Sequence, residues 1–218
     1  MRKTKIVIFL AFLSIALFDN AYAQPTENTE ASSSVALTSE SVPAPTPQLT
    51  DIVDFTELRE TFAKRADYET RCEAIVPANE WKKAMDAKNY SGAYDIVTKL
   101  LSRCPVDARF HLRGIDSLKE LGETDKITEH KRWWIGLTDS VLKSGDGKTP
   151  QTALVTISVG EEYATLVRLG LKRGEQSLVN GPPLVDMHVV QPIADSTKRV
   201  TIYFNPRWHF IRLTLRER

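Results

Sequence analysis

The feature that most constrains this chain is a change in the spacing of its apolar residues at Pro150. From Phe55 to about Lys143, apolar side chains recur at intervals of three and four residues, which is typical of amphipathic helices. After Pro150, short segments alternate apolar with polar side chains, as strands do. Helices followed by strands predict an α+β fold, in which amino-terminal helical hairpins pack on a small antiparallel or mixed sheet with one helix.

The first 23 residues have the layout of a secretory signal peptide. The basic stretch MRKTK precedes a thirteen-residue apolar run, and Ala21, Tyr22 and Ala23 form a small-residue cleavage triplet. The run is shorter than the roughly 20 residues that a membrane-spanning helix needs. We therefore expect a periplasmic or secreted protein with no membrane span after cleavage, and an uncleaved membrane anchor is the alternative.

Residues 24–50 are rich in Ser, Thr, Pro and Glu and almost free of large apolar side chains. Such a segment cannot bury enough apolar surface to offset the cost of ordering, so we expect a disordered tether. The rest divides into a helical repeat-like region, 51–143, and an α+β sheet region, 144–218, which we expect to form one compact unit. The formal net charge of +1 does not indicate a nucleic-acid partner.

Two segments of the helical region repeat at a spacing of 34 residues, so that the turn at 88–90 recurs at 122–124. This is the length of a tetratricopeptide repeat, and Tyr90, Ala93 and Pro105 resemble that family's turn tyrosine, small packing residue and closing proline. Two units are fewer than the three or so that such repeats usually need to be stable alone. We therefore expect the sheet region to cover the open end.

The chain has two cysteines, Cys72 and Cys104. They lie near the start of the first helix of the repeat and at the end of its second helix, and these two ends are adjacent in an antiparallel hairpin. An exported protein meets an oxidising environment, so we expect the pair to form a disulfide.

Two of the four histidines, His111 and His130, lie on apolar helix faces. If the hairpin turns near Glu123, they are offset by four or five residues, or roughly 6 to 8 Å along the helix axes. That offset is too large for a shared metal ion, and neither histidine has a cysteine or a second histidine one turn away. We interpret both as core residues and predict no metal site.

The stretch SGDGKTPQTA, beginning at Ser144, resembles a phosphate-binding loop at first sight. Such a loop needs a glycine at the position that Leu142 occupies here, and it leads from a strand into a helix, whereas this stretch leads from a helix into a strand. We therefore interpret it as a turn and expect no nucleotide and no cofactor.

Three acidic residues around this turn, Asp146, Glu161 and Glu162, are candidate binding residues. Together they could hold a calcium ion or act as acid and base. The alternative is structural, because aspartate suits a tight turn and glutamates in the first turn of a helix interact favourably with its dipole.

A weaker catalytic candidate lies in the predicted strand LVDMHVV, which has Asp186 and His188 on one face. If the strand RVTIYFN pairs with it antiparallel, Thr201 and Tyr203 could share that face. An aspartate, a histidine and a hydroxyl can form a hydrolytic set, but polar residues on the wet side of a sheet give the same pattern. Alternation also predicts strands at 152–160 and at HFIRLTL, 209–215.

Residues 143–179, with the motifs SGDGKTPQTA, ISVGEEY, LGL and QSLV, and the later strand VTIYFN, resemble an exported bacterial family known as Domain of Unknown Function 4919. The resemblance runs from the FTELRETF segment to Phe204. It implies a helical front followed by a small sheet, and it implies no activity, cofactor or catalytic residue.

The sequence therefore favours a non-enzymatic binding or scaffolding module whose partner is a protein or peptide. A small exported hydrolase is the competing interpretation. It would use Asp186, His188 and Tyr203, or the acidic residues Asp146 and Glu161.

Overall fold

The structure is a computed structural model that describes residues 53–72 and 76–216. The expected signal peptide, 1–23, and tether, 24–50, lie outside the described residues. Helices come first along the chain and a four-stranded sheet follows, so the predicted α+β fold is confirmed. Among the described residues, no helix combines the length and apolar character that crossing a membrane requires.

The helical half begins with two short helices, α1 (Phe55–Ala63) and α2 (Tyr68–Cys72). Helix α1 starts where it does because the Asp54 carboxylate accepts hydrogen bonds from the backbone amides of Thr56 and Glu57. Its apolar side chains pack on the main core, as their spacing predicts.

Two helical hairpins follow. Helices α3 (Val76–Asp86) and α4 (Tyr90–Arg103) form the first, and α5 (Ala108–Leu121) and α6 (Thr124–Leu142) form the second. Gly122 ends α5 in the left-handed region, with φ 73°, where glycine has no steric cost. The turns of both hairpins fall where the 34-residue repeat predicts them.

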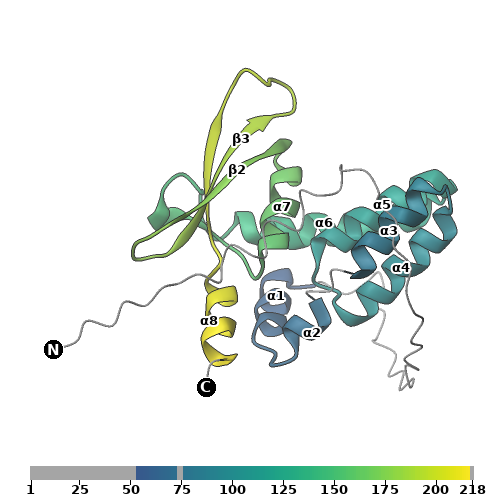
Figure 1. Cartoon of the computed structure of the whole chain (residues 1–218), viewed down its shortest axis with the longest axis horizontal. Coiled ribbons are helices and arrows are strands. Elements are labelled where there is room, and N and C mark those ends of the chain that lie inside the picture. The colour runs from purple at the N-terminus through teal and green to yellow at the C-terminus, as the bar shows by residue number, and fades with distance from the viewer. Residues whose placement is uncertain (1–52, 73–75, 217–218) are drawn as a thin grey trace, which may run out of the picture. The chain divides into compact units, whose positions relative to one another are not determined.

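The second half forms one sheet with α7 (Val159–Arg168) packed against it (Figure 1). Its strands are β1 (Leu154–Val155), β2 (Leu171–Val179), β3 (Val185–Pro192) and β4 (Val200–Asn205), in the order β1-β4-β3-β2. Strand β1 runs parallel to β4, and the other pairs are antiparallel, so the sheet is mixed. A 3₁₀ turn, η2 (Pro150–Thr152), precedes β1, and helix α8 (Arg207–Arg216) follows β4.

The strand predicted at 152–160 was largely wrong. Only the two residues of β1 pair with β4, and α7 already begins at Val159, because the Ser158 hydroxyl accepts a hydrogen bond from the backbone amide of Glu161. Thr156 and Ile157 are adjacent in the sequence, and in a strand with one exposed face one of them would be exposed. Both are buried here. The alternation of apolar and polar residues at 152–160 therefore does not mark a buried face and a solvent-exposed face of a strand.

The strand predicted at 209–215 was also wrong, since these residues belong to α8. Trp208 and Arg212, one helical turn apart, both face the helical core: Trp208 packs on it, and Arg212 donates to Glu69 and to the carbonyl of Ile157. Prediction missed β2 altogether, because a glycine and several charged residues interrupt any apolar alternation there.

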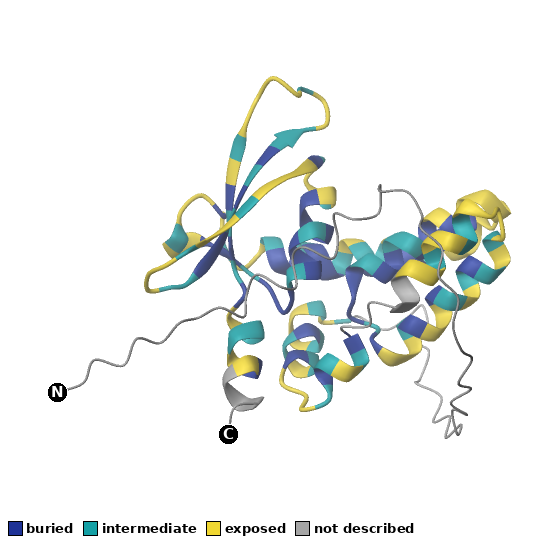
Figure 2. Cartoon of the chain, in the orientation of Figure 1, coloured by how far each residue is buried: buried dark blue, intermediate teal, exposed yellow. Residues whose placement is uncertain are grey.

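The core lies between the two halves of the described fold as well as within each. One apolar cluster joins the helices to α7, and a second lies between α6, α7 and the sheet (Figure 2). Cys72 and Cys104 belong to the first cluster. Their sulfur atoms are 2.09 Å apart, at disulfide distance, as the sequence predicts, although Cys72 ends the separate helix α2 instead of starting the hairpin.

We predict that the purified protein has no free thiol. Alkylation of denatured, unreduced protein followed by mass measurement should add no label, whereas reduction first should add two. Replacing both cysteines by serine should lower the free energy of unfolding by roughly 3 kcal/mol, because the crosslink restricts the unfolded chain. Labelling of the unreduced protein would contradict the pairing.

Candidate functional site

The polar residues that could carry chemistry are mostly buried in the described fold. They form three groups: an ion pair between Arg59 and Glu161, a cluster around Glu162 and His188, and a contact between two histidines. A catalytic or binding residue must be reachable by its ligand, so the burial and the partners of each group decide its role.

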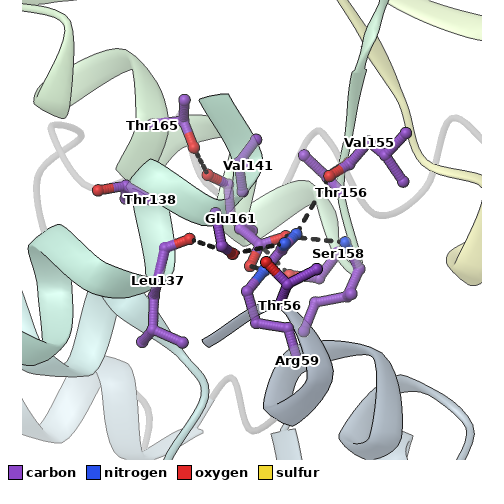
Figure 3. A network of polar contacts seen from close by, with 12 residues as sticks. Thr56, Arg59, Leu137, Thr138, Val141, Val155, Thr156, Ser158, Glu161 and Thr165 are labelled. Carbon is purple, nitrogen blue, oxygen red and sulfur yellow. Dashed lines mark hydrogen bonds and ion pairs between the residues drawn. The ribbon is translucent and has the colours of Figure 1, made fainter. Parts of the chain in front are cut away.

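Arg59 and Glu161 form a bidentate ion pair between α1 and the first turn of α7 (Figure 3). The two nitrogen–oxygen distances are 2.5 and 2.6 Å, and the side chains are 4% and 3% exposed. Arg59 also donates to the Ser140 hydroxyl and to the Val155 carbonyl, and Glu161 accepts from the Ile157 amide. These hydrogen bonds join α1, α6, β1 and the start of α7, so the pair connects four elements of the fold.

Glu162, the next residue, points to the sheet and contacts His188 on β3. The Glu162 Oε2 and His188 Nε2 atoms are 2.9 Å apart, and both side chains are completely buried. The Thr156 hydroxyl donates to the other carboxyl oxygen of Glu162 at 3.3 Å. Asp186 lies beside Glu162 and also accepts a hydrogen bond from Gln176. The structure thus brings together Glu162, Asp186 and His188.

The 2.9 Å contact has the geometry of an ion pair, but burial favours the uncharged forms of both partners. Burial, and then the negative charge of Asp186, raises the pKa of Glu162 well above its usual value. Burial, and then the positive charge of Arg173, lowers the pKa of His188 to about 4. Both shifts favour a neutral hydrogen bond, in which His188 Nε2 donates to a protonated Glu162.

This cluster lacks the access that turnover requires. Glu162 and His188 are fully buried, and Asp186 is 8% exposed. The Nδ1 atom of His188 has no hydrogen-bond partner in the described chain, so it is left as a bare acceptor, and the His188 ring packs edge-to-face with the rings of Tyr163 and Phe204. A substrate could reach these atoms only after α7 moved away from the sheet.

Tyr203 does not belong to this cluster, contrary to the hydrolytic set that the sequence suggested. In the register of β3 and β4, His188 is opposite Ile202 and Tyr203 is opposite Met187. Cross-strand partners share a face, so Tyr203 and Thr201 lie on the other side of the sheet. The predicted hydrolytic set required a solvent-exposed face of the sheet, whereas His188 lies on the face that α7 covers.

Asp146 does not join Glu161 and Glu162. It lies in an exposed turn, where it accepts hydrogen bonds from the Lys148 amide and the Thr152 hydroxyl. The two glutamates are buried and have different partners. Within the described ranges, no group of three or more His, Cys, Asp or Glu side chains is arranged to hold a metal ion.

His111 and His130 are in direct contact, which corrects the offset estimated from the sequence. Their Nδ1 atoms are 3.2 Å apart. The helices approach closely because α5 has a glycine at this point: a Cβ on Gly114 would lie 2.8 Å from the His130 ring. Both histidines are core residues, as expected, and His111 also stacks on Trp133.

The hydrogen bonds of the two histidines fix one neutral arrangement. The Pro105 carbonyl can only accept, so His111 Nε2 donates to it and His111 Nδ1 is left as an acceptor. His130 Nδ1 then donates to His111, and the Tyr94 hydroxyl donates to His130 Nε2. Burial lowers the pKa of His111 to about 4, in agreement with this neutral chain.

The edge of the sheet is an exposed feature that the sequence did not reveal. Strand β2, which alternation failed to predict, forms an edge of the sheet and is exposed along most of its length (Figure 2). Beside it, α7 and β2 line a small cavity of about 150 Å³ that is open on one side. The stretch QSLV at the end of β2 was recognised only as part of a family pattern.

The turn at Ser144–Ala153 should be sensitive to its glycines and not to its lysine. A Cβ at Gly145 would lie 2.4 Å from the Thr152 carbonyl oxygen, and Gly147 has φ 67°. Gly145→Val or Gly147→Val should lower the free energy of unfolding by about 1 kcal/mol or more. Lys148→Ala is the matched control, because that side chain is 79% exposed.

Thermal melting with and without ATP or GTP tests the same turn for nucleotide binding. We expect no shift for the parent protein or for Lys148→Ala. A nucleotide-dependent rise in melting temperature that Lys148→Ala abolishes would show that the turn is a phosphate site.

Glu162→Gln should change how stability depends on pH. The folded state keeps a proton on Glu162 that the unfolded state releases above about pH 4.5, so stability is lost as pH rises toward the raised folded pKa. Glutamine mimics the protonated acid, so the variant should match the parent near pH 5 and exceed it at pH 8 in urea unfolding. An equal, large loss at both pH values would instead indicate a charged pair with His188.

The same unfolding measurements below pH 6.5 provide an internal control. His188 and His111 have folded pKa values of about 4 and a usual value of 6.5. The unfolded state therefore gains protons that the folded state does not, and stability falls as pH drops from 6.5 to about 4. Parent and Glu162→Gln should both show this loss.

Comparison with known proteins identifies a family without an assigned activity. The family model described as Domain of unknown function (DUF4919) matches residues 54–205, which span the fold from the start of α1 to the end of β4. No curated protein and no solved structure matches the chain. The matched segment covers more than half of the chain, and the protein therefore belongs to the DUF4919 family.

Proposed function

We propose that this protein is an exported, non-enzymatic binding module whose partner is another protein or a peptide. The observation that carries the proposal is the contrast between buried and exposed groups. Glu162 and His188, the side chains best suited to acid–base chemistry, are completely buried, whereas the edge strand β2 is exposed. Binding requires an exposed surface, and catalysis requires reachable reactive groups.

Export is supported by the signal-peptide pattern of residues 1–23 and by the cysteine pair. A disulfide persists in an oxidising compartment and is rare in reducing ones. The tether expected at 24–50 would let the folded part reach a partner in the periplasm or outside the cell.

A small hydrolase is the second candidate, because the fold does bring Asp186, Glu162 and His188 together. Their burial and mutual hydrogen bonds weigh against it. A buried carboxyl next to a histidine can also serve only to satisfy polar groups in the core.

Two parallel measurements test the proposal. In the first, the purified protein is assayed against ester, peptide and glycoside substrates. In the second, photo-crosslinking groups are placed at exposed positions on β2 and on α4, and the proteins that they capture in the source cells are identified. We expect no turnover, and one reproducible partner crosslinked from one surface. Turnover that His188→Gln removes while the fold stays intact would replace the binding module with the hydrolase.

A further inference from the structure

Arg113 on α5 is a positively charged side chain without an acidic partner in the described part of the chain. Its guanidinium carbon lies 5.3 Å from the centre of the Trp81 ring on α3 and 5.7 Å from that of Phe110. Its Nη1 atom is buried and has no hydrogen-bond partner among the described residues. Arg109, one turn earlier, does have a partner, since it pairs with Asp107 at 2.5 Å. Of these two neighbouring arginines, Arg113 is therefore the one whose charge the described fold leaves without a counter-ion.

A charge in this position is costly. Arginine keeps its proton at any physiological pH, so Arg113 cannot avoid the cost by becoming neutral. Burial, and then the positive charge of Arg109, lower the pKa of Arg113, which shows that both disfavour the charged form. A bound anion would offset both penalties and would explain why the fold keeps an unsatisfied polar group here.

The guanidinium is held in place with one edge open. The indole N–H of Trp81 donates to the Ser117 hydroxyl at 3.0 Å, and this hydrogen bond fixes the ring against which Arg113 packs. Arg113 is only partly buried, and its Nε and Nη2 atoms are not among the buried atoms that lack a partner, so this edge is open to solvent. Nε and Nη2 can bind one carboxylate through two parallel hydrogen bonds. A guanidinium that is already fixed loses little side-chain entropy on binding.

The surroundings of Arg113 favour a carboxylate of a protein over a polyanion. Glu80, Asp116 and Glu120 are exposed on the same two helices, α3 and α5. Their charges would repel the many phosphates of a nucleic acid, whereas a single carboxylate at Arg113 meets less repulsion. Tryptophan and arginine are also enriched among the residues that dominate the affinity of protein–protein interfaces.

We propose that Trp81 and Arg113 form a docking site on the α3–α5 face for a protein partner, in which Arg113 binds an aspartate or glutamate side chain of that partner through Nε and Nη2. The proposal rests on the proposed binding function, and it names the surface and the group that is recognised. The partner's carboxylate supplies the counter-ion that Arg113 lacks, and Trp81 supplies a ring beside it for apolar contact.

The first test needs no ligand. Arg113→Met keeps an apolar side chain against the two rings and removes the unpaired charge, so its midpoint of urea unfolding should equal or exceed that of the parent. Arg109→Met is the matched variant: it leaves the buried Asp107 carboxylate without its partner, so it should lower the midpoint. A loss for Arg113→Met as large as that for Arg109→Met would show that Arg113 already has an acidic partner within the chain, and would overturn the proposal.

The second test uses the purified chain, labelled with ¹⁵N, and two capped pentapeptides that differ only in a central glutamate or glutamine. The glutamate peptide at millimolar concentration should shift the signals of the Trp81 indole and of Arg113 Nε, and the glutamine peptide should not. Arg113→Lys keeps the charge but loses the planar fork, so it should bind the glutamate peptide about tenfold more weakly. Lys131→Met, at an exposed position on α6, is the control and should leave the affinity unchanged.

The absence of any shift with the glutamate peptide, or equal shifts with the glutamine peptide, would overturn the proposal. Equal or larger shifts with inorganic phosphate at the same ionic strength would also overturn it, because Arg113 would then bind a free anion in place of a protein. A partner that is crosslinked from α4 or β2 and binds Arg113→Met as tightly as the parent would leave the proposed binding function standing and remove only this site.

Discussion

The buried ion pair between Arg59 and Glu161 is the interaction on which the rest of the structure depends. It joins the first helix to α7, and through the hydrogen bonds of Arg59 to Ser140 and Val155 it also holds α6 and β1. Two charges leave water favourably only when their geometry is good and their remaining hydrogen-bonding groups have partners, as they have here. This network places α7 on the sheet, and α7 in turn buries His188 and forms one wall of the cavity beside β2.

The residues that look catalytic in the sequence serve the fold for the same physical reason. A histidine or carboxyl in an apolar layer takes its neutral form and pairs with another polar group, because an unpaired buried charge is costly. Glu162 with His188 and His111 with His130 both follow this rule. What the described surface retains is an open strand edge next to an apolar cavity, and these features suit binding.

Local chemistry made much of the fold predictable. The helical spacing of apolar residues from Phe55 to Lys143 and the 34-residue repeat located the helices and the turns of both hairpins, because helical periodicity is set within a few residues of the chain. Long-range facts were not predictable: the register that sends Tyr203 away from His188, the glycine that lets His111 touch His130, and the helix at 207–216 whose Arg212 is held by Glu69. The edge strand β2 was missed because exposure and a bulge remove the alternation that marks a half-buried strand.

The most direct measurement of this account is a double-mutant cycle on Arg59 and Glu161, read as the free energy of urea unfolding. Arg59→Met and Glu161→Met each leave a buried charge without a partner, so each should cost about 3 to 5 kcal/mol. The double variant removes both charges and should be less destabilised than the sum of the two single variants. Losses below about 1 kcal/mol that simply add would contradict the account, since exposed, uncoupled charges behave in that way.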